Sequence, residues 1–111
     1  MSNQLDRVLD ALGEPNRRRI VELLADRPRP VGGVAAELPI GRPAVSKHLK
    51  VLGDAGLVRH HSRGTSNVYA LAPDGLVELR RWLEGTWGEV LGSFAAYVDT
   101  AEAPRPEQEE E

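Results

Sequence analysis

The chain has 111 residues, a formal net charge of −3 and no cysteine. Its length suits one domain with a modest core, and the missing cysteines exclude disulfides, thiolate metal sites and thiol-based redox sensing. The first residues lack the basic and apolar regions of a signal peptide, and no stretch approaches the ~20 apolar residues of a membrane span. We therefore expect a cytoplasmic protein with no membrane contact.

The charges are distributed unevenly along the sequence. Residues 1–72 carry eleven Lys and Arg against seven Asp and Glu, a balance of +4, whereas residues 73–111 carry three against ten, a balance of −7. Screening limits the reach of a charge to ~8–10 Å at ordinary salt, so the local balance matters more than the total. A basic first part and an acidic last part predict two surfaces with different roles.

Three short helices are expected in the first part of the chain. The first carries Leu5, Val8, Leu9 and Leu12 on one side, at the i, i+3, i+4, i+7 spacing of an amphipathic helix. The second begins with a proline where the missing N–H costs nothing, and the third is weakened by two adjacent glycines. The expected limits are a first helix ending at Gly13, a second from Glu14-Pro15 to Pro28, and a third from Val31 to Leu38, after a break at Arg29-Pro30.

The stretch from Ile40 to Gly56 contains the most informative pattern. On a wheel of 100° per residue, Val45, Leu49 and Leu52 fall within about 60° and form an apolar stripe. The opposite face holds Pro43, Ser46, Lys47 and Lys50. Small, hydroxyl and cationic side chains suit the DNA major groove, where acidic groups would be repelled by the phosphates. After a short helix and a tight turn, this helix, with Gly41 as its N-cap, completes a helix-turn-helix pattern.

A β-hairpin is expected directly after this helix. The extended stretches 57–62 and 67–71 flank the polar turn 63–66. A hairpin in this place is the wing of a winged-helix domain, and Arg59 and Arg63 would lie near its tip, over the DNA backbone or a minor groove. The two adjacent histidines of its first strand point to opposite faces and cannot hold one metal ion together, so we expect a structural role for them.

A long apolar stripe marks the last helical stretch, which is expected to run from Asp74, as its cap, to Val98. Gly85, Gly88 and Gly92 leave open whether it is one continuous helix or is bent or divided into two. The stripe recurs every seven residues and cannot be buried within so small a domain, so we interpret it as a subunit interface packed with the first helix. The residues expected in this dimer interface are Leu5, Leu9, Leu76, Leu83, Trp87, Val90, Phe94 and Tyr97. Residues 1–99 would form one DNA-binding and dimerisation domain, and residues 100–111 an acidic disordered tail.

Four segments, residues 11–20, 42–52, 55–58 and 69–71, resemble the arsenic-repressor (ArsR) family of bacterial winged-helix transcription regulators. The resemblance covers about residues 4–98. It implies a mainly α fold with a small β-hairpin (α+β), a winged helix-turn-helix with N- and C-terminal dimerisation helices. It also implies a homodimer that binds a double-stranded DNA operator, usually as a repressor.

The resemblance also implies which side chains contact DNA. With Pro43 added from the helical wheel, the expected DNA-binding residues are Arg42, Pro43, Ser46, Lys47, His48, Lys50, Arg63 and Thr65. The wheel places His48 on the flank between the apolar stripe and the groove side, where a packed, hydrogen-bonded histidine near a phosphate and one that reads a base are both open. Metal-sensing members of the family carry cysteines before the turn, or His and carboxylate ligands on the last helix. This chain has Val34 to Leu38 at the first place and no histidine after His61, so it resembles the cysteine-free branch without metal sites.

Other functions fit the sequence less well. A winged helix that binds a protein would be expected to expose apolar or acidic residues on the 42–52 helix. A small-molecule-responsive regulator could use a pocket at the dimer interface near Trp82 and Trp87; such an inducer is compatible with the sequence but not indicated by it. No enzyme is expected, because the sequence has no nucleophile–base set, phosphate-cradling loop or metal cluster. No catalytic, cofactor-binding or metal-binding residue is therefore predicted.

Overall fold

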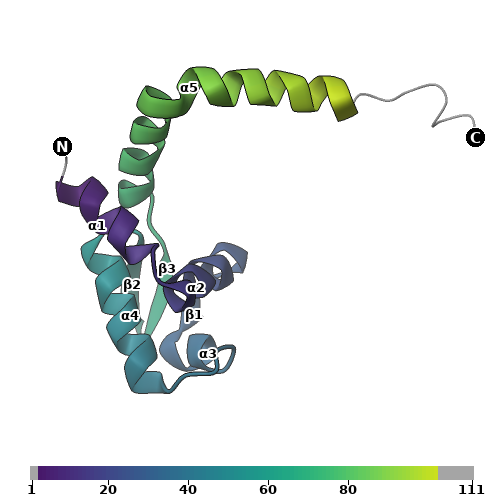
Figure 1. Cartoon of the computed structure of the whole chain (residues 1–111). Helices are drawn as coiled ribbons and strands as arrows, with labels where there is room; N and C mark the ends of the chain where they lie inside the picture. The colour runs from purple at the N-terminus through teal and green to yellow at the C-terminus, as the bar shows by residue number, and fades with distance from the viewer. Residues whose placement is uncertain (1–2, 103–111) are drawn as a thin grey trace, which may run out of the picture. The chain divides into compact units, whose positions relative to one another are not determined.

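The computed structural model describes residues 3–102 and contains five helices and three strands within that range (Figure 1). In chain order they are α1 (Asn3–Ala11), α2 (Pro15–Asp26), β1 (Arg29–Pro30), α3 (Val31–Ala35), α4 (Arg42–Asp54), β2 (Val58–Arg63), β3 (Ser66–Leu71) and α5 (Asp74–Glu102). The chain divides into two compact units, with the boundary between Arg80 and Arg81 inside α5. None of the described helices is long and apolar enough to cross a membrane. The predicted mainly α fold with a small hairpin is confirmed.

The core of the first unit lies between the four helices α1, α2, α3 and α4 and the base of the hairpin. Its buried cluster contains Val8, Ala11, Ile20, Leu24, Val34, Leu38, Val45, Leu49, Leu52, Ala55, Leu57 and Val58. The apolar stripe predicted on α4 is confirmed, since Val45, Leu49 and Leu52 are each 1 % exposed or less. Burial of this stripe fixes which side of α4 remains at the surface.

The three strands form one antiparallel sheet in the order β1-β3-β2. Arg29-Pro30 separates α2 from α3 as expected, and it also forms the edge strand β1, which the sequence did not predict: Arg29 pairs with Tyr69 and Pro30 with Val68. A two-residue strand has no readable alternation, and a proline is tolerated only because β1 is an edge strand. Arg29 is also buried, and its guanidinium donates to the Leu23 carbonyl at 3.2 Å, so this pairing has an anchor in α2.

The hairpin turn is tighter than the four residues expected for it. Arg63 and Ser66 still pair, which leaves Gly64 and Thr65 as the turn. Gly64 has a φ of +63°, and glycine at the first central position is typical of a type II′ turn. Ser62 and Asn67 form the adjacent pair of the ladder, and Ser62 Oγ lies 3.4 Å from Asn67 Oδ1.

Helices α1 and α2 end two residues before their expected limits, and α3 and α5 differ from theirs by more. Helix α3 ends at Ala35, and after its C-cap Ala36 the chain continues only as i→i+3 turns at Glu37 and Leu38, in keeping with its weak glycine-containing start. Helix α5 is continuous to Glu102, through all three of its inner glycines and three residues into the expected tail. Its first backbone bond runs from Val77 N to Pro73 O, so Asp74 lies in the first turn and is not the cap. The rest of the predicted tail lies outside the described residues.

Helix α5 begins in close contact with the core of the first unit. Gly75 is buried, and its N–H donates to the Gly56 carbonyl at 2.8 Å. A Cβ at position 75 would lie 2.7 Å from the Ala55 carbonyl oxygen. Gly56 itself has a φ of +80°, the conformation in which α4 ends. Two glycines therefore allow the end of α4 and the start of α5 to touch.

Candidate nucleic-acid interface

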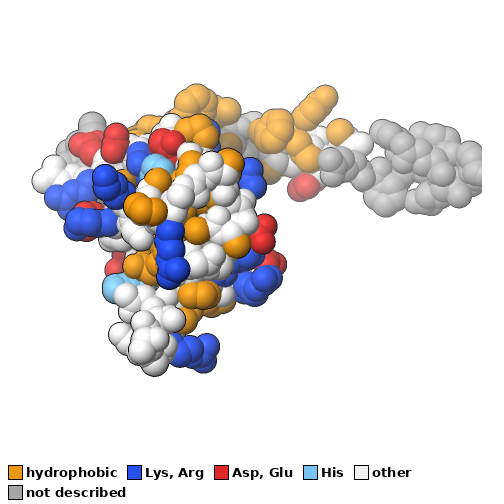
Figure 2. Space-filling model, turned by 90° about the horizontal axis from the view of Figure 1, so that it is seen from below, with side chains coloured by type: hydrophobic (Ala, Val, Ile, Leu, Met, Phe, Trp, Pro, Cys, Tyr) orange, Lys and Arg blue, Asp and Glu red, His pale blue; other side chains and the backbone are white. Residues whose placement is uncertain are grey.

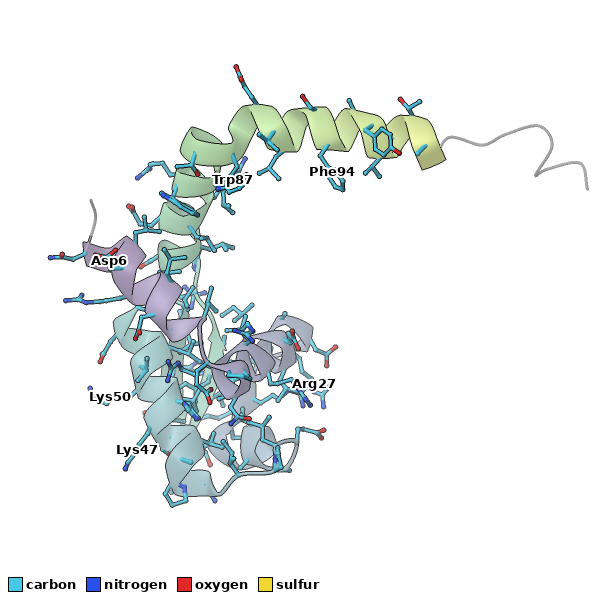
Figure 3. The ribbon with its side chains drawn as sticks, in the orientation of Figure 1. Asp6, Arg27, Lys47, Lys50, Trp87 and Phe94 are labelled. Carbon is cyan, nitrogen blue, oxygen red and sulfur yellow. The ribbon has the colours of Figure 1, made fainter. Side chains whose placement is uncertain are left out.

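The surface of α4 opposite its buried stripe carries the side chains predicted to meet DNA. Arg42, Pro43, Ser46, Lys47 and Lys50 are all exposed. Lys47 and Lys50 project from the same side of the helix, away from the core (Figure 3). Gly41 is the N-cap as predicted, and no side chain caps this end. A helix held by one apolar stripe thus presents small and cationic groups along its free side.

The cations of this surface differ in their surroundings. Lys50 Nζ lies 3.6 Å from Asp54 Oδ2, an exposed i,i+4 pair whose net attraction is weak in water. The guanidinium of Arg42 lies near α3, as shown by the distance of 3.7 Å between its Nη1 and a Cβ placed on Gly32. Seen from below, Lys and Arg side chains stand at separate places on the molecule and not in a single patch (Figure 2). Such spacing suits contacts with several separate phosphates.

His48 is placed differently from its predicted partners. Its side chain is only 18 % exposed, on the flank of α4 that faces the start of α2. Its Nδ1 lies 3.5 Å from Arg17 Nη1, and its Nε2 lies 4.0 Å from Glu14 Oε1. The ring is therefore engaged within the chain.

The three consecutive arginines of α2 mostly serve the fold. Arg17 donates to the carbonyls of Ala11 at 2.7 Å and Asp10 at 3.2 Å, and Arg18 donates to the Leu12 carbonyl at 2.6 Å. These bonds satisfy carbonyls at the end of α1 that have no partner within the helix.

Glu14 caps the start of α2. The Arg17 N–H donates to Glu14 Oε1 at 3.0 Å, and this backbone bond, assisted by the nearby Arg17 side chain, holds the pKa of Glu14 below its ordinary value. The cap fixes the turn between α1 and α2, and His48 contacts two residues of this region, Glu14 and Arg17.

The wing brings further polar residues to this surface. Arg63 and Thr65 are exposed at or next to the turn. Between α4 and the hairpin lies a hollow of about 600 Å³, lined by Ser46, Leu49, Lys50, Gly53, Asp54, Val58, Arg59, His60 and Tyr69. His60 stacks on Tyr69 across the strands, with ring centroids 4.9 Å apart.

His60 and Tyr69 lie outside the predicted set of DNA-binding residues. The alternation of β2 is enough to predict from sequence that His60 lies on the same side as Val58, but only the strand register shows that Tyr69 faces it.

Within the described part of the chain, no three His, Asp or Glu side chains are grouped so that they could hold a metal ion.

The residues predicted for the dimer interface are mostly exposed. The exposed ones are Leu9, Leu76, Trp87, Val90, Phe94 and Tyr97. Leu83 is half-buried, and Leu5 is buried within the chain itself, which leaves little of it for a partner. In the second unit, Trp87 and Phe94 of α5 are 50 % and 61 % exposed (Figure 3). An uncovered run of large apolar side chains on one helix is typical of an interaction surface.

Comparison with known proteins gives consistent matches. Residues 14–60 match the model of the family described as "Bacterial regulatory protein, arsR family". The chain is 47 % identical over 95 residues to the HTH-type transcriptional regulator Rv2034 of Mycobacterium tuberculosis, covering 86 % of this chain and 89 % of that protein. It is 29 % identical to the transcriptional repressor SdpR of Bacillus subtilis, covering 71 % and 88 % of the two chains.

A solved structure matches the fold. A homodimeric winged helix-turn-helix DNA-binding domain from Mycobacterium bovis superposes with a TM-score of 0.65 at 24 % identity, covering 93 % of this chain and 89 % of that one. The assignment of α3 and α4 as a helix-turn-helix and of β2–β3 as a wing is therefore confirmed at the level of the fold.

Proposed function

The chain belongs to the arsR family of bacterial regulatory proteins, which makes it a DNA-binding regulator of transcription, and we propose that it acts as a homodimeric repressor. In this proposal α4 enters the major groove and the wing, residues 62–67, lies on the backbone or a minor groove. The observation that carries it is the two-sided α4, with Val45, Leu49 and Leu52 buried and its cationic side free. The proposal takes the cytoplasm as the location and requires no inducer.

Specificity would come from the middle of α4. Lys47 and Ser46 are exposed and can reach base edges, where Lys donates to guanine O6 and N7 and Ser bonds to several bases. Arg42 at the helix start and Arg63 on the wing would contact phosphates, which position the protein but carry no sequence information. Acidic side chains do not oppose this role on α4, apart from Asp54 at its last turn.

Dimerisation would double this reading element. Val90, Phe94 and Tyr97 on α5 are 57 to 70 % exposed, and a second copy could cover them. Burial of each large apolar side chain contributes about 1.5–3 kcal/mol. The M. bovis relative of the same fold is described as homodimeric. Two copies would place two α4 helices in successive major grooves, about 34 Å apart.

A mobility-shift assay tests the proposal. The probe is a duplex from the DNA upstream of the protein's own gene, at low salt, followed by a footprint. We expect a shift and a two-fold-related protected site of one to two helical turns. No shift at low salt would overturn DNA binding, and would favour a winged helix that binds a protein.

A further inference from the structure

One guanidinium connects three helices beside the proposed DNA-reading surface. Arg17 lies in the first turn of α2, and its side chain donates to the last carbonyls of α1, Asp10 and Ala11. Its Nη1 also reaches His48 on α4, at 3.5 Å. Glu14 accepts the Arg17 backbone N–H and fixes the turn from which the guanidinium extends. Contacts with α1 and with Glu14 therefore hold Arg17 in place independently of α4.

The chemistry of this contact defines the state of the histidine ring. A guanidinium has only donors, so Nδ1 of His48 must accept from Arg17 Nη1, and the ring proton lies on Nε2. That proton faces Glu14 Oε1 at 4.0 Å. Nδ1 therefore faces Arg17 and Nε2 faces the N-cap residue of α2, and a base or phosphate contact through Nδ1 would require the ring to leave Arg17.

From this geometry we infer that His48 is a positioning residue, which sets the rotation of α4 about its axis and does not itself contact DNA. The inference rests on the proposed function. Apolar packing of the Val45 stripe is non-directional and tolerates small rotations, whereas a hydrogen bond to a fixed guanidinium is directional. Ser46 and Lys47 directly precede His48, so the rotation that the histidine selects decides where these two side chains meet the groove.

Two substitutions separate positioning from contact. His48→Asn retains an acceptor near the place of Nδ1, and His48→Leu keeps bulk but removes the acceptor. Each full-length variant is titrated with the upstream duplex and with a shuffled duplex of equal length and composition, at several salt concentrations. We expect His48→Leu to lower the ratio of upstream to shuffled affinity about 2- to 10-fold. The salt slope should stay unchanged, and His48→Asn should keep most of the ratio.

A double-mutant cycle with Arg17→Gln completes the test. Because the two side chains act through one contact, we expect the losses of Arg17→Gln and His48→Leu to be less than additive. Additive losses would overturn the inference. A salt slope reduced by about one in both His48 variants would overturn it in favour of a phosphate contact. Equal losses of DNA affinity in His48→Asn and His48→Leu, confined to one base pair of the site, would overturn the inference in favour of a base contact by His48.

Instability alone has a different signature. A variant that is merely less folded loses active protein for both duplexes, so the affinity ratio would not change, and that result would also overturn the inference. A wild-type chain that shifts neither duplex would overturn the proposed function, and this inference with it. Failure of the inference alone is recognised by a wild-type shift with an unchanged ratio in His48→Leu.

Discussion

Glu14 shows how one side chain makes the fold sensitive to pH. Its carboxylate accepts the Arg17 N–H at 3.0 Å, which lowers its pKa from 4.5 in the folded chain. A carboxyl whose pKa is lower when folded stabilises the protein above its unfolded pKa, and that stabilisation is lost as the pH falls through the folded value. We therefore expect the Glu14 contribution to disappear as the pH drops below about 4.5.

The test uses Glu14→Gln, which keeps an acceptor but cannot titrate. Urea midpoints of wild type and variant should differ at pH 7 and converge towards pH 3, since protonated Glu14 resembles the amide. The Arg17–His48 contact is retained in the variant, so its effect on the midpoints cancels. A constant difference between the two proteins over the whole range would contradict the assignment of the cap.

Arg63 is the residue whose substitution tests the wing. Arg63→Ala should weaken upstream and shuffled duplexes alike and reduce the slope of log K against log salt by about one, because one phosphate contact is lost. Arg27→Ala is the matched control. Arg27 is exposed, pairs with Asp26 at 2.7 Å and lies on the side of the first unit away from Lys47 and Lys50 (Figure 3). An unchanged slope in Arg63→Ala, or an equal loss in the control, would contradict the wing contact.

At the scale of elements, the sequence is informative where local pattern and burial coincide. The stripe of α4 and its glycine N-cap are both visible in sequence, and the structure has them as expected. The strand β1 could not be predicted, because its two residues become a strand only through pairing with β3, about forty residues later. The position of His48 is similar: its wheel angle places it on a flank, but only the folded chain brings Arg17 to it.

The contact between α4 and α5 gives a prediction about stability. Gly75→Ala should destabilise the fold by about 1–3 kcal/mol, because over-packing forces the backbone apart. The new Cβ would meet the Ala55 carbonyl oxygen at 2.7 Å and the side chains of Leu57 and Val8 at 3.0 Å. Gly85→Ala, in the same helix, is the control, since a Cβ there meets nothing within 4 Å. That substitution should be neutral or stabilising by about 0.5–1 kcal/mol.

Chemical denaturation of the two alanine variants measures both effects at once. The expected order of stability is Gly85→Ala, then wild type, then Gly75→Ala. If Gly75→Ala were as stable as wild type, the start of α5 would not be packed on the end of α4 as the structure has it.

At the scale of the whole molecule, the two parts of the chain have different surfaces. The first 72 residues carry the positive balance of +4 and include α4 and the wing, whereas the last 39 carry −7. An acidic segment is unsuited to DNA and would be repelled by it. We therefore expect the apolar side chains of α5 to contact a second copy of the chain and not nucleic acid. DNA binding is then assigned to the first part of the sequence and dimerisation to the last part.

This division predicts that assembly can be removed without unfolding the first unit. Val90→Asp and Phe94→Asp place a charge on side chains that are 57 % and 61 % exposed, so the single chain loses little packing. In a dimer each carboxylate would be buried without a partner, at a cost of several kcal/mol. Both variants should therefore elute as monomers in size-exclusion chromatography, and Leu83→Asp should do the same. Their circular dichroism should remain close to that of wild type.

DNA binding shows whether the dimer is the form that reads the operator. A monomer engages one half-site, so the effective-concentration advantage of a second linked half-site is lost, and affinity for the upstream duplex should fall by about 10²-fold or more. Val77→Asp is the control: Val77 is on the same helix and 48 % exposed, but lies outside the predicted interface. It should leave both the elution volume and the affinity unchanged. A dimer that persists in Leu83→Asp and Val90→Asp would show that the subunits meet elsewhere than along this side of α5.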